Sequence, residues 1–458
     1  MKLRKLTLAN FRGFEQIDLD FADEVTVIAG VNGVGKSGVL KALTTAMSLA
    51  LPKFTVSRES PLGLSDIDVQ SGKPGLSMSA TLELDAAIVI VDLTRAAPLE
   101  ADKAETLIKR RDELRFATRE TKKGSNEEQD INDEIRLIDI QLDQASDIAA
   151  VRILPNDATT EADELVTTLK GGAKQPLAVF YTTSRFLSRL PRTLPKTKKI
   201  DAASAYDKSL SQPEVSLNDF ANWYRVVVAE AAAAYRDRLF LQLEQAIKTF
   251  LPEVSNLKLH EGRPPRFSVM KSGQVLFLEQ LSDGERGLLA LVFDLTRRLA
   301  IANPESANPI AEGVALVLID EIELHLHPSW QRRVLRLLQS TFIGCQFIVT
   351  THSPQVIGQV RPAKLRLLHR DDAGRVVLAD AAQSFGMDSS WILQNIMGVP
   401  ARDHETEQRL SAIYLAIDED NLEKARALAE QLRADIGDFP DLQEAHALLD
   451  RFALLRSE

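Results

Sequence analysis

Polar and apolar residues alternate from Lys2 to Leu8 at the start of the chain, which predicts a strand. A second apolar run, Val25–Ile28, leads into a glycine-rich loop, and a helix of about Lys36–Leu51 is expected after it. A turn-rich stretch then separates this helix from a further strand at Leu76–Leu84. Strands and helices that succeed one another in this way indicate the opening of an α/β domain.

The segment 86–172 has a different pattern. Two stretches, Ala101–Thr121 and Glu127–Asp147, are highly charged with sparse apolar positions, and Lys122–Asn126 between them is a turn signal. We interpret this segment as an inserted antiparallel helical hairpin with arms about 30 Å long. The pattern is equally compatible with a solvent-exposed insertion that has no function of its own and with a functional arm.

Strand signals return at Leu177–Tyr181, and one long helix is expected over Leu217–Leu251. The elements expected next are the strands Phe267–Lys271 and Val275–Leu278, the helix Glu285–Ala302, the strand Ala315–Ile319, the helix Ser329–Gln339 and the strand Gln346–Thr350. Their alternation implies a parallel sheet with crossover helices. From Ser389 the pattern is helical to the end, with breaks near Gly398 and Gly437. Four parts are therefore expected, at 1–85, 86–172, 173–388 and 389–458.

Residues Gly30–Ser37 read Gly-Val-Asn-Gly-Val-Gly-Lys-Ser and match the phosphate-binding P-loop pattern throughout. Glycines let backbone N–H groups wrap phosphates, and the start of the following helix favours negative charge. Lys36 is predicted to neutralise the β- and γ-phosphates of ATP, and the Ser37 hydroxyl to bind Mg²⁺. The residues predicted to contact the nucleotide here are Asn32, Gly33, Gly35, Lys36 and Ser37.

The segment Val314–Ile319 is continuously apolar and ends in two acids, Asp320 and Glu321. Such a run predicts a strand buried on both faces, and acids at its carboxyl end fall where these sheets bind ligands. We predict that Asp320 holds Mg²⁺ and that Glu321 polarises the attacking water. An acid pair that starts a helix is the alternative, and the P-loop makes it much weaker.

Two further short motifs fit the same site. In Leu281–Glu285, Ser282 caps a predicted helix and Gly284 permits a close approach, so the turn can present a hydroxyl and free N–H groups to a phosphate. Alone, this string is an ordinary helix cap. His352 ends a strand expected to neighbour the strand of Asp320, which would let it reach a γ-phosphate.

Composition and charge limit the classes of partner that the protein is expected to bind. The formal net charge is −10, which does not favour a protein coated with nucleic acid, although Arg185–Lys199 is basic and has no acid. A solvated loop is the simpler reading of that segment. The single cysteine, Cys345, excludes an internal disulfide, and no signal peptide or membrane span is found, so a cytoplasmic protein without membrane contact is expected. A metal pair at His325 and His327 lacks further ligands; a loop that crosses to a second subunit is favoured.

Four motifs follow one another along the chain: the P-loop, the turn Leu281–Glu285, the acids Asp320-Glu321 and His352. In this order they resemble the nucleotide-binding domains of the ABC superfamily. Asn10-Phe-Arg12-Gly-Phe14 resembles the N-terminal element of its SMC, Rad50 and RecF branch, in which the Arg helps to bind nucleotide. The resemblance implies an α/β ABC-type P-loop ATPase head with a mixed or parallel sheet and flanking helices, here carrying the inserted hairpin and a C-terminal helical module. It also implies ATP and Mg²⁺ as cofactors and a head-to-tail homodimer, in which Ser282 and Gly284 complete the partner's site.

Three further blocks, Pro176–Arg185, Ser204–Asp207 and Asp219–Trp223, resemble the PtuA ATPases of Septu and retron anti-phage systems. In that family the ATPase assembles with a small HNH nuclease and controls its attack on nucleic acid. For this chain we expect at least a homodimer and a higher oligomer. The C-terminal helices are then a candidate docking region. One departure is that no Q-loop glutamine follows Leu177–Tyr181; Gln70 is a weak alternative.

Two other functions stay open on sequence alone. One is a RecF- or Rad50-like DNA-repair ATPase, which requires a surface that binds DNA. The other is an ATPase like the OLD family without its Toprim nuclease, since the acids of the tail, Asp371-Asp372 and Asp418-Glu-Asp420, lie in a region that reads as helical rather than α/β.

Overall fold

The computed structural model describes residues 1–96, 101–120, 131–132, 134–135, 138, 148–156, 162–172, 174–400 and 402–455 of the 458-residue chain. The chain divides into two compact units, Met1–Gly386 and Met387–Glu458. Within the described ranges, no helix combines the length and the apolar character that crossing a membrane requires.

A six-stranded sheet forms the centre of the first unit, in the order β14-β13-β3-β12-β11-β7. Its strands are β3 (Val25–Ala29), β7 (Leu177–Tyr181), β11 (Ala315–Ile319), β12 (Gln346–Thr351), β13 (Leu365–Arg370) and β14 (Val376–Ala379). Neighbours pair in parallel, except that β14 is antiparallel to β13. Every residue of β3, β11 and β12 is buried, as in strands covered on both faces. The predicted parallel sheet is confirmed for all strands but β14, and the carboxyl ends of the parallel strands share one edge.

A second, antiparallel sheet has the order β2-β1-β4-β5-β6. Its strands are β1 (Lys2–Phe11), β2 (Phe14–Asp20), β4 (Gly75–Glu83), β5 (Ala87–Ala96) and β6 (Ile148–Pro155). The assignment of all of 86–172 to a helical insertion therefore differs from the structure, because β5 and β6 are strands. In β5 alternate side chains are buried, and pairing with β4 places Ala87, Val89, Val91 and Leu93 on the covered face.

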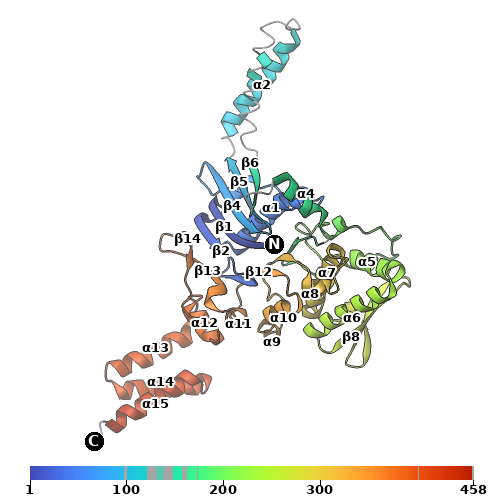
Figure 1. Cartoon of the computed structure of the whole chain (residues 1–458). Helices are drawn as coiled ribbons and strands as arrows, with labels where there is room; N and C mark the ends of the chain where they lie inside the picture. The colour runs from blue at the N-terminus through green and yellow to red at the C-terminus, as the bar shows by residue number, and fades with distance from the viewer. Residues whose placement is uncertain are drawn as a thin grey trace. The chain divides into compact units, whose positions relative to one another are not determined.

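Helix α1 (Lys36–Phe54) packs between the two sheets (Figure 1). It contacts β4, β5 and β6 of the antiparallel sheet, and β7 and β11 of the central sheet. Side chains all round the helix are buried, which explains why it shows little amphipathic character. The P-loop lysine, Lys36, is its first residue, so both sheets fix the start of this helix.

The helical part of the insertion begins with α2 (Ala101–Glu120), which confirms the first arm of the predicted hairpin. The second arm, Glu127–Asp147, and the predicted turn lie largely outside the described residues. A further helix, α4 (Ala162–Gly171), follows β6 and packs against α1. It was not predicted.

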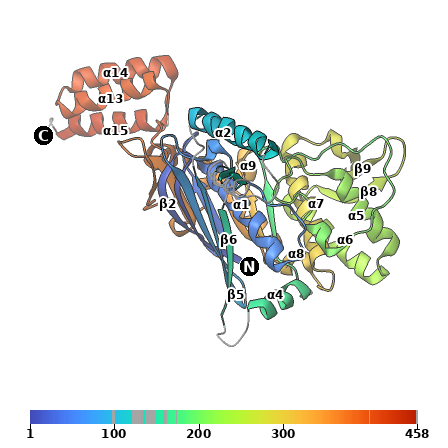
Figure 2. The same ribbon diagram turned by 90° about the horizontal axis from the view of Figure 1, so that it is seen from above.

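The long helix expected over Leu217–Leu251 is two helices, α5 (Leu217–Glu230) and α6 (Ala233–Phe250), which Figure 2 shows beside each other. Ala231 and Ala232 between them have extended backbones, with ψ of 143° and 138°. Tertiary packing overrides the helical propensity of the alanines. Helix α5 faces α7 (Asp283–Ala302), whereas α6 packs also on β8 (Val254–His260) and on α10 (Val334–Thr341).

The α5–α7 contact centres on the rings of Phe220 and Phe293, which stack with centroids 4.4 Å apart. Strands β9 (Arg266–Lys271) and β10 (Gln274–Phe277) complete a small sheet with β8. The helix expected at Ser329–Gln339 is likewise divided, into α9 (Pro328–Gln331) and α10. The turn Leu281–Glu285 lies in this region, at the start of α7.

A buried ionic cluster joins α7 to β7. The carboxylate of Asp294 contacts the guanidinium groups of Arg297 and Arg298, each at 2.8 Å, and accepts a hydrogen bond of 3.1 Å from the Tyr181 hydroxyl. Burial by itself would raise the pKa of Asp294, but the two arginines lower it to about 2. Arg298 also donates to the carbonyl of Ala205 at 2.7 Å. The cluster therefore holds α7 against the strand that neighbours β11.

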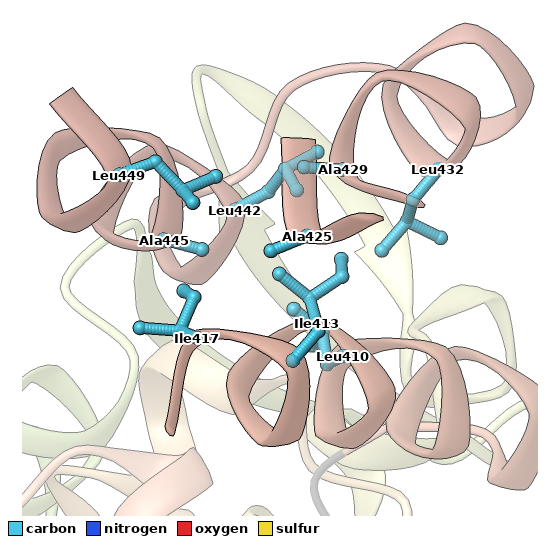
Figure 3. Close-up of a cluster of buried hydrophobic side chains, with 10 residues drawn as sticks. Leu410, Ile413, Ile417, Ala425, Ala429, Leu432, Leu442, Ala445 and Leu449 are labelled. Carbon is cyan, nitrogen blue, oxygen red and sulfur yellow. The ribbon is translucent and has the colours of Figure 1, made fainter. Parts of the chain in front are cut away.

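The second unit is helical, with α12 (Ser389–Asn395), α13 (His404–Asp418), α14 (Leu422–Ile436) and α15 (Pro440–Leu455). The last three pack around a core of their own, shown in Figure 3. The core consists of Leu410, Ile413, Ala416, Ile417, Ala425, Ala429, Leu432, Leu442, Ala445 and Leu449. The helical pattern predicted from Ser389 is confirmed, and Gly398 and Gly437 both have positive φ at the expected breaks.

Candidate nucleotide-binding site

The P-loop joins β3 to α1 and depends on its glycines. Gly30, Gly33 and Gly35 have φ of 153°, 76° and 106°, values that side chains disfavour. A Cβ on Gly30 would lie 2.4 Å from the carbonyl oxygen of Leu368, and one on Gly35 would lie 2.7 Å from the ring of Phe14. The loop can therefore wrap closely only with glycine at these positions.

Lys36 folds back over this loop. Its Nζ donates to the carbonyls of Gly30 at 2.8 Å and Val31 at 3.1 Å, and the residue is only 6% exposed. Burial lowers the pKa of Lys36, whereas the negative charges of Glu321, Glu323 and Asp320 act in the opposite direction. The lysine thus lies within electrostatic reach of the acids that follow β11, and added phosphate charge would favour its protonated form.

Strand β12 separates β3 from β11 and aligns their ends. Ala29 pairs with Thr351, and Ile319 pairs with Val349, so the P-loop, His352 and Asp320 all leave the sheet at one edge. This confirms that the strand before His352 neighbours the strand of Asp320.

The backbone at the two acids is held by Thr350. Its hydroxyl donates to the carboxylate of Asp320 and accepts the N–H of Glu321 at 2.8 Å. Glu321 has φ of 46°, which is unfavourable for a residue with a side chain. Three contacts fix this geometry, because the N–H of Ile322 also donates to the Thr350 carbonyl at 3.1 Å.

A third acid, Glu323, was not singled out from the sequence. It is 5% exposed, and its Oε1 accepts the backbone N–H of His352 at 2.7 Å. The Nδ1 of His352 lies 3.0 Å from the same oxygen, while the His352 side chain is 41% exposed. The signal was available, since Glu323 is two residues beyond Glu321. It lies against the histidine that was predicted to reach the γ-phosphate.

The turn Leu281–Glu285 forms the predicted cap of α7. The Ser282 hydroxyl donates to Glu285 at 2.8 Å, and Glu285 also pairs with Lys271 of β9 at 2.7 Å. Burial would raise the pKa of Glu285, but Lys271 and Ser282 lower it. A pocket of about 490 Å³ opens beside the turn and is lined partly by Lys271, Trp330 and Arg333.

Gly284 allows a close approach, as predicted, but to protein backbone. A Cβ there would lie 2.6 Å from the carbonyl oxygen of His325. Within the described part of the chain, no hydrogen bond or ion pair joins Ser282 or Gly284 to residues 30–37. One chain therefore does not bring these two motifs together.

Arg12 lies over the first turn of α1, with its Cδ 3.4 Å from the position of a Cβ on Gly38. Its Nε donates to Asp68 at 2.7 Å, and Lys41 of α1 donates to the same carboxylate at 2.9 Å. Asp68 is fully buried, and these cations together with Ser65 hold its pKa far below the usual range, although burial alone acts in the opposite direction. Nothing in the sequence near Asp68 marked it.

The basic segment 185–199 is not uniformly solvated. The side chain of Arg185 is buried and donates to the carbonyls of Asp320 at 2.7 Å and Glu321 at 2.8 Å. The other basic residues are exposed, as expected of a solvated loop: Arg189, Arg192, Lys196, Lys198 and Lys199. The solvated interpretation is therefore wrong for Arg185 alone.

His325 and His327 have different local partners. The His325 ring packs against Phe186 with centroids 5.1 Å apart, and the His327 side chain caps α9 through the N–H of Ser329 at 3.3 Å. Across the residues that can be described, no three His, Cys, Asp or Glu side chains come together as a metal site. Cys345 is buried, which raises its pKa to about 12 and suits a structural role.

A protein family described as "AAA domain, putative AbiEii toxin, Type IV TA system" matches residues 25–358. The chain belongs to this family. The match runs from β3 through the P-loop, the acids after β11 and His352, and so includes the whole edge described above. The chain is thus a member of an AAA-domain family, and it is similar to proteins named as a retron probable ATPase and as Septu PtuA.

Two relatives show how far the sequence similarity extends along the chain. The chain is 28% identical to "Retron Ec83 probable ATPase" of Escherichia coli, over 88% of this chain and 78% of that protein. It is 26% identical to "Septu protein PtuA" of Bacillus thuringiensis, over 34% of this chain and 41% of that protein. Among solved structures, "SMC head domain from Thermotoga maritima" matches at 14% identity and a TM-score of 0.40, over 84% of this chain and all of that one.

Proposed function

We propose that the chain binds ATP with Mg²⁺ at the edge formed by the P-loop, Asp320–Glu321 and His352, and hydrolyses it. The observation that carries this proposal is the common edge itself, where a buried lysine and three acids interact electrostatically across three parallel strands. The glycine loop offers N–H groups to phosphate oxygens, and Ser37 and Asp320 offer the hard oxygen donors that Mg²⁺ prefers.

Each residue then has a distinct role. Lys36 compensates the charge of the β- and γ-phosphates, and Asn32, Gly33 and Gly35 form the loop around them. Ser37 and Asp320 would hold Mg²⁺, which would neutralise part of the phosphate charge when bound. Glu321 accepts a proton from, or orients, the attacking water, and His352 stabilises charge at the γ-phosphate, oriented by Glu323. Arg12, held by Asp68, contacts the nucleotide from the β1–β2 turn.

The site is completed, in this proposal, by a second copy of the chain. Among the residues that the structure describes, no hydrogen bond or ion pair joins Ser282 or Gly284 to the P-loop of the same chain. A head-to-tail dimer would let them meet the nucleotide held by the partner. Closure around two nucleotides would bury both sites and exclude bulk water, which strengthens the electrostatic interactions there.

We infer further that this ATPase serves an anti-phage defence complex and controls a separate, small HNH nuclease. Support comes from the kinship to retron and Septu proteins. The helices of Met387–Glu458, with a core of their own, are the proposed docking region for that nuclease.

The decisive enzymatic test compares the parent chain with Glu321→Gln. We expect Mg²⁺-dependent phosphate release by the parent and a loss of about 100-fold or more in the variant, with nucleotide binding retained. Native mass spectrometry with ATP and Mg²⁺ should show a dimer or larger assembly, most abundant for Glu321→Gln. Equal turnover in the two proteins would remove the role given to Glu321.

The defence role needs a separate test. A tagged chain recovered from its native host with ATP and Mg²⁺ should carry a small HNH protein. Recovery of a bare dimer, together with duplex DNA binding that weakens steeply with salt, would instead support a RecF-like repair function. Metal-dependent DNA cleavage by the purified chain alone would favour the OLD-like alternative.

A further inference from the structure

The guanidinium group of Arg185 lies directly behind the acids that follow β11. One terminal nitrogen donates to the Asp320 carbonyl at 2.7 Å, and the other donates to the carbonyls of Glu321 at 2.8 Å and Ile322 at 3.1 Å. These residues are 135 to 137 positions away in sequence. A single side chain therefore donates hydrogen bonds to the carbonyl groups of three consecutive residues.

This arrangement is unusual for a buried arginine. Arg185 is 6% exposed, and in the described part of the chain its hydrogen-bond partners are backbone carbonyls, including that of Thr182 at 3.3 Å, and not carboxylates. Burial lowers its pKa to about 10, so the group stays charged at neutral pH. A buried charge is costly, and its retention beside a candidate active site calls for a benefit there.

The benefit is the shape of the turn at Glu321, whose φ of 46° is unfavourable. Thr350 binds the turn from the N–H side, and Arg185 binds it from the carbonyl side. With both sides fixed, the Glu321 side chain leaves the backbone in one direction. If the carbonyl side is released, the turn can relax and the carboxylate shifts away from the attacking water.

Arg185 is itself fixed in place. The segment after β7 is bound to residues near Val215, since the Val215 N–H donates to the Phe186 carbonyl at 2.9 Å and the Ser188 N–H donates to the Val215 carbonyl at 2.9 Å. Phe186 also packs on His325, beyond the acids. The segment thus contacts the acid turn at two points.

We propose that Arg185 is a positioning residue for ATP hydrolysis, which sets the direction of Glu321 by holding the carbonyls of Asp320, Glu321 and Ile322. It occupies the stretch after β7 in which no Q-loop glutamine is found. This inference rests on the proposed function, since it requires Glu321 to act on water.

The test uses the full-length chain and the variants Arg185→Lys and Arg185→Met. Lysine keeps the charge but cannot place two nitrogens on three carbonyls. We expect kcat for ATP to fall about 10- to 100-fold in both, because a displacement near 1 Å can cost that much. The Kd of a fluorescent ATP analogue should stay within about threefold, because the hydrogen bonds of Arg185 in the described part of the chain go to the carbonyls of Thr182 and of Asp320–Ile322 and not to the P-loop. The matched control is Arg189→Lys, an exposed arginine of the same segment, which should turn over like the parent.

A double-mutant comparison separates positioning from general stability. In the Glu321→Gln background, Arg185→Lys should cause less than about a twofold further loss, because both changes remove one interaction. If the parent hydrolyses ATP and both Arg185 variants have the same kcat as the parent, this inference is overturned, whereas the proposed function stands. Absence of ATP turnover in the parent would instead overturn the proposed function. If circular dichroism shows both variants unfolded, Arg185 has a purely structural role and the inference falls.

Discussion

The carboxylate of Asp68 accepts a hydrogen bond of 2.7 Å from the Nε of Arg12, across 56 residues of sequence. Lys41 donates to the same carboxylate from helix α1 at 2.9 Å. A fully buried acid thus ties the β1–β2 turn to the helix that begins with the P-loop lysine. Arg12, which the sequence marked as a nucleotide contact, depends on a partner that the sequence did not mark.

Asp68→Asn should destabilise the protein by about 2 kcal/mol at pH 7, because two cations lose their buried counter-charge. Asp66→Asn is the control, since Asp66 lies in the same short turn but is largely exposed in its pair with Arg95. Its loss should be within about 0.5 kcal/mol. Urea unfolding of the three proteins measures both, and equal stability of Asp68→Asn and the parent would contradict the role of this acid.

The same comparison has a defined pH dependence. The pKa of Asp68 is lowered in the folded state from an ordinary value of 3.8. The unfolded chain therefore binds a proton first, and the stability that Asp68 provides is complete above pH 5 and declines as the pH falls below about 4. The difference between the parent and Asp68→Asn should narrow over that lower range and be constant between pH 5 and 7.

Lys36→Ala should weaken ATP binding by about 100-fold, since a charge-assisted contact with phosphate is worth up to about 3 kcal/mol. Lys53→Ala, an exposed lysine in the last turn of the same helix, is the matched control and should bind like the parent. Isothermal titration with a slowly hydrolysed ATP analogue gives both values. Parent-like affinity in Lys36→Ala would place the phosphates elsewhere.

Two glycines of helix α7 give opposite expectations. Gly284→Ala places a Cβ 2.6 Å from the His325 carbonyl, so either the turn or the His325 segment must move. We expect a loss of at least about tenfold in ATP turnover and about 1–3 kcal/mol in stability. Gly287→Ala meets no atom within 4 Å and should stabilise the helix by about 0.5–1 kcal/mol. Thermal unfolding and phosphate release distinguish them, and the reverse order would exclude the close approach.

The buried ionic cluster should respond in a graded way. Asp294→Asn leaves Arg297 and Arg298 without their counter-charge, which should cost about 3 kcal/mol or more. Tyr181→Phe removes only one hydrogen bond to Asp294 and should cost about 1 kcal/mol. Denaturant titration at pH 7 tests the order. A larger loss in Tyr181→Phe would mean that the hydrogen bond of the hydroxyl, and not the charge of Asp294, dominates there.

Local sequence patterns predicted the elements that carry the chemistry. Continuous apolar runs marked β3 and β11, and the P-loop, the acids and His352 follow their strands in the structure at one edge. In contrast, Ala87–Ala96 opens with the β-branched apolar run Ile88–Val91, which is typical of a strand, but it was grouped with the charged hairpin that follows it. The sequence signal of a strand was present, and it was missed because the domain boundary was set before it.

Other features could not be read from local sequence, because they depend on contacts between distant residues. The break at Ala231–Ala232 interrupts a segment of strong helical propensity and arises from separate packing partners of α5 and α6. The buried position of Arg185 depends on carbonyls more than 130 residues away. In sequence it was one basic residue among several in a charged segment.

The three packed helices of Met387–Glu458 share a hydrophobic core of their own. Substitutions on their outer surface therefore need not be compensated in the catalytic unit, and changes near the nucleotide need not be compensated in these helices. Selection can act on the two parts independently. The proposed docking region can therefore change in sequence while the proposed nucleotide-binding site stays the same.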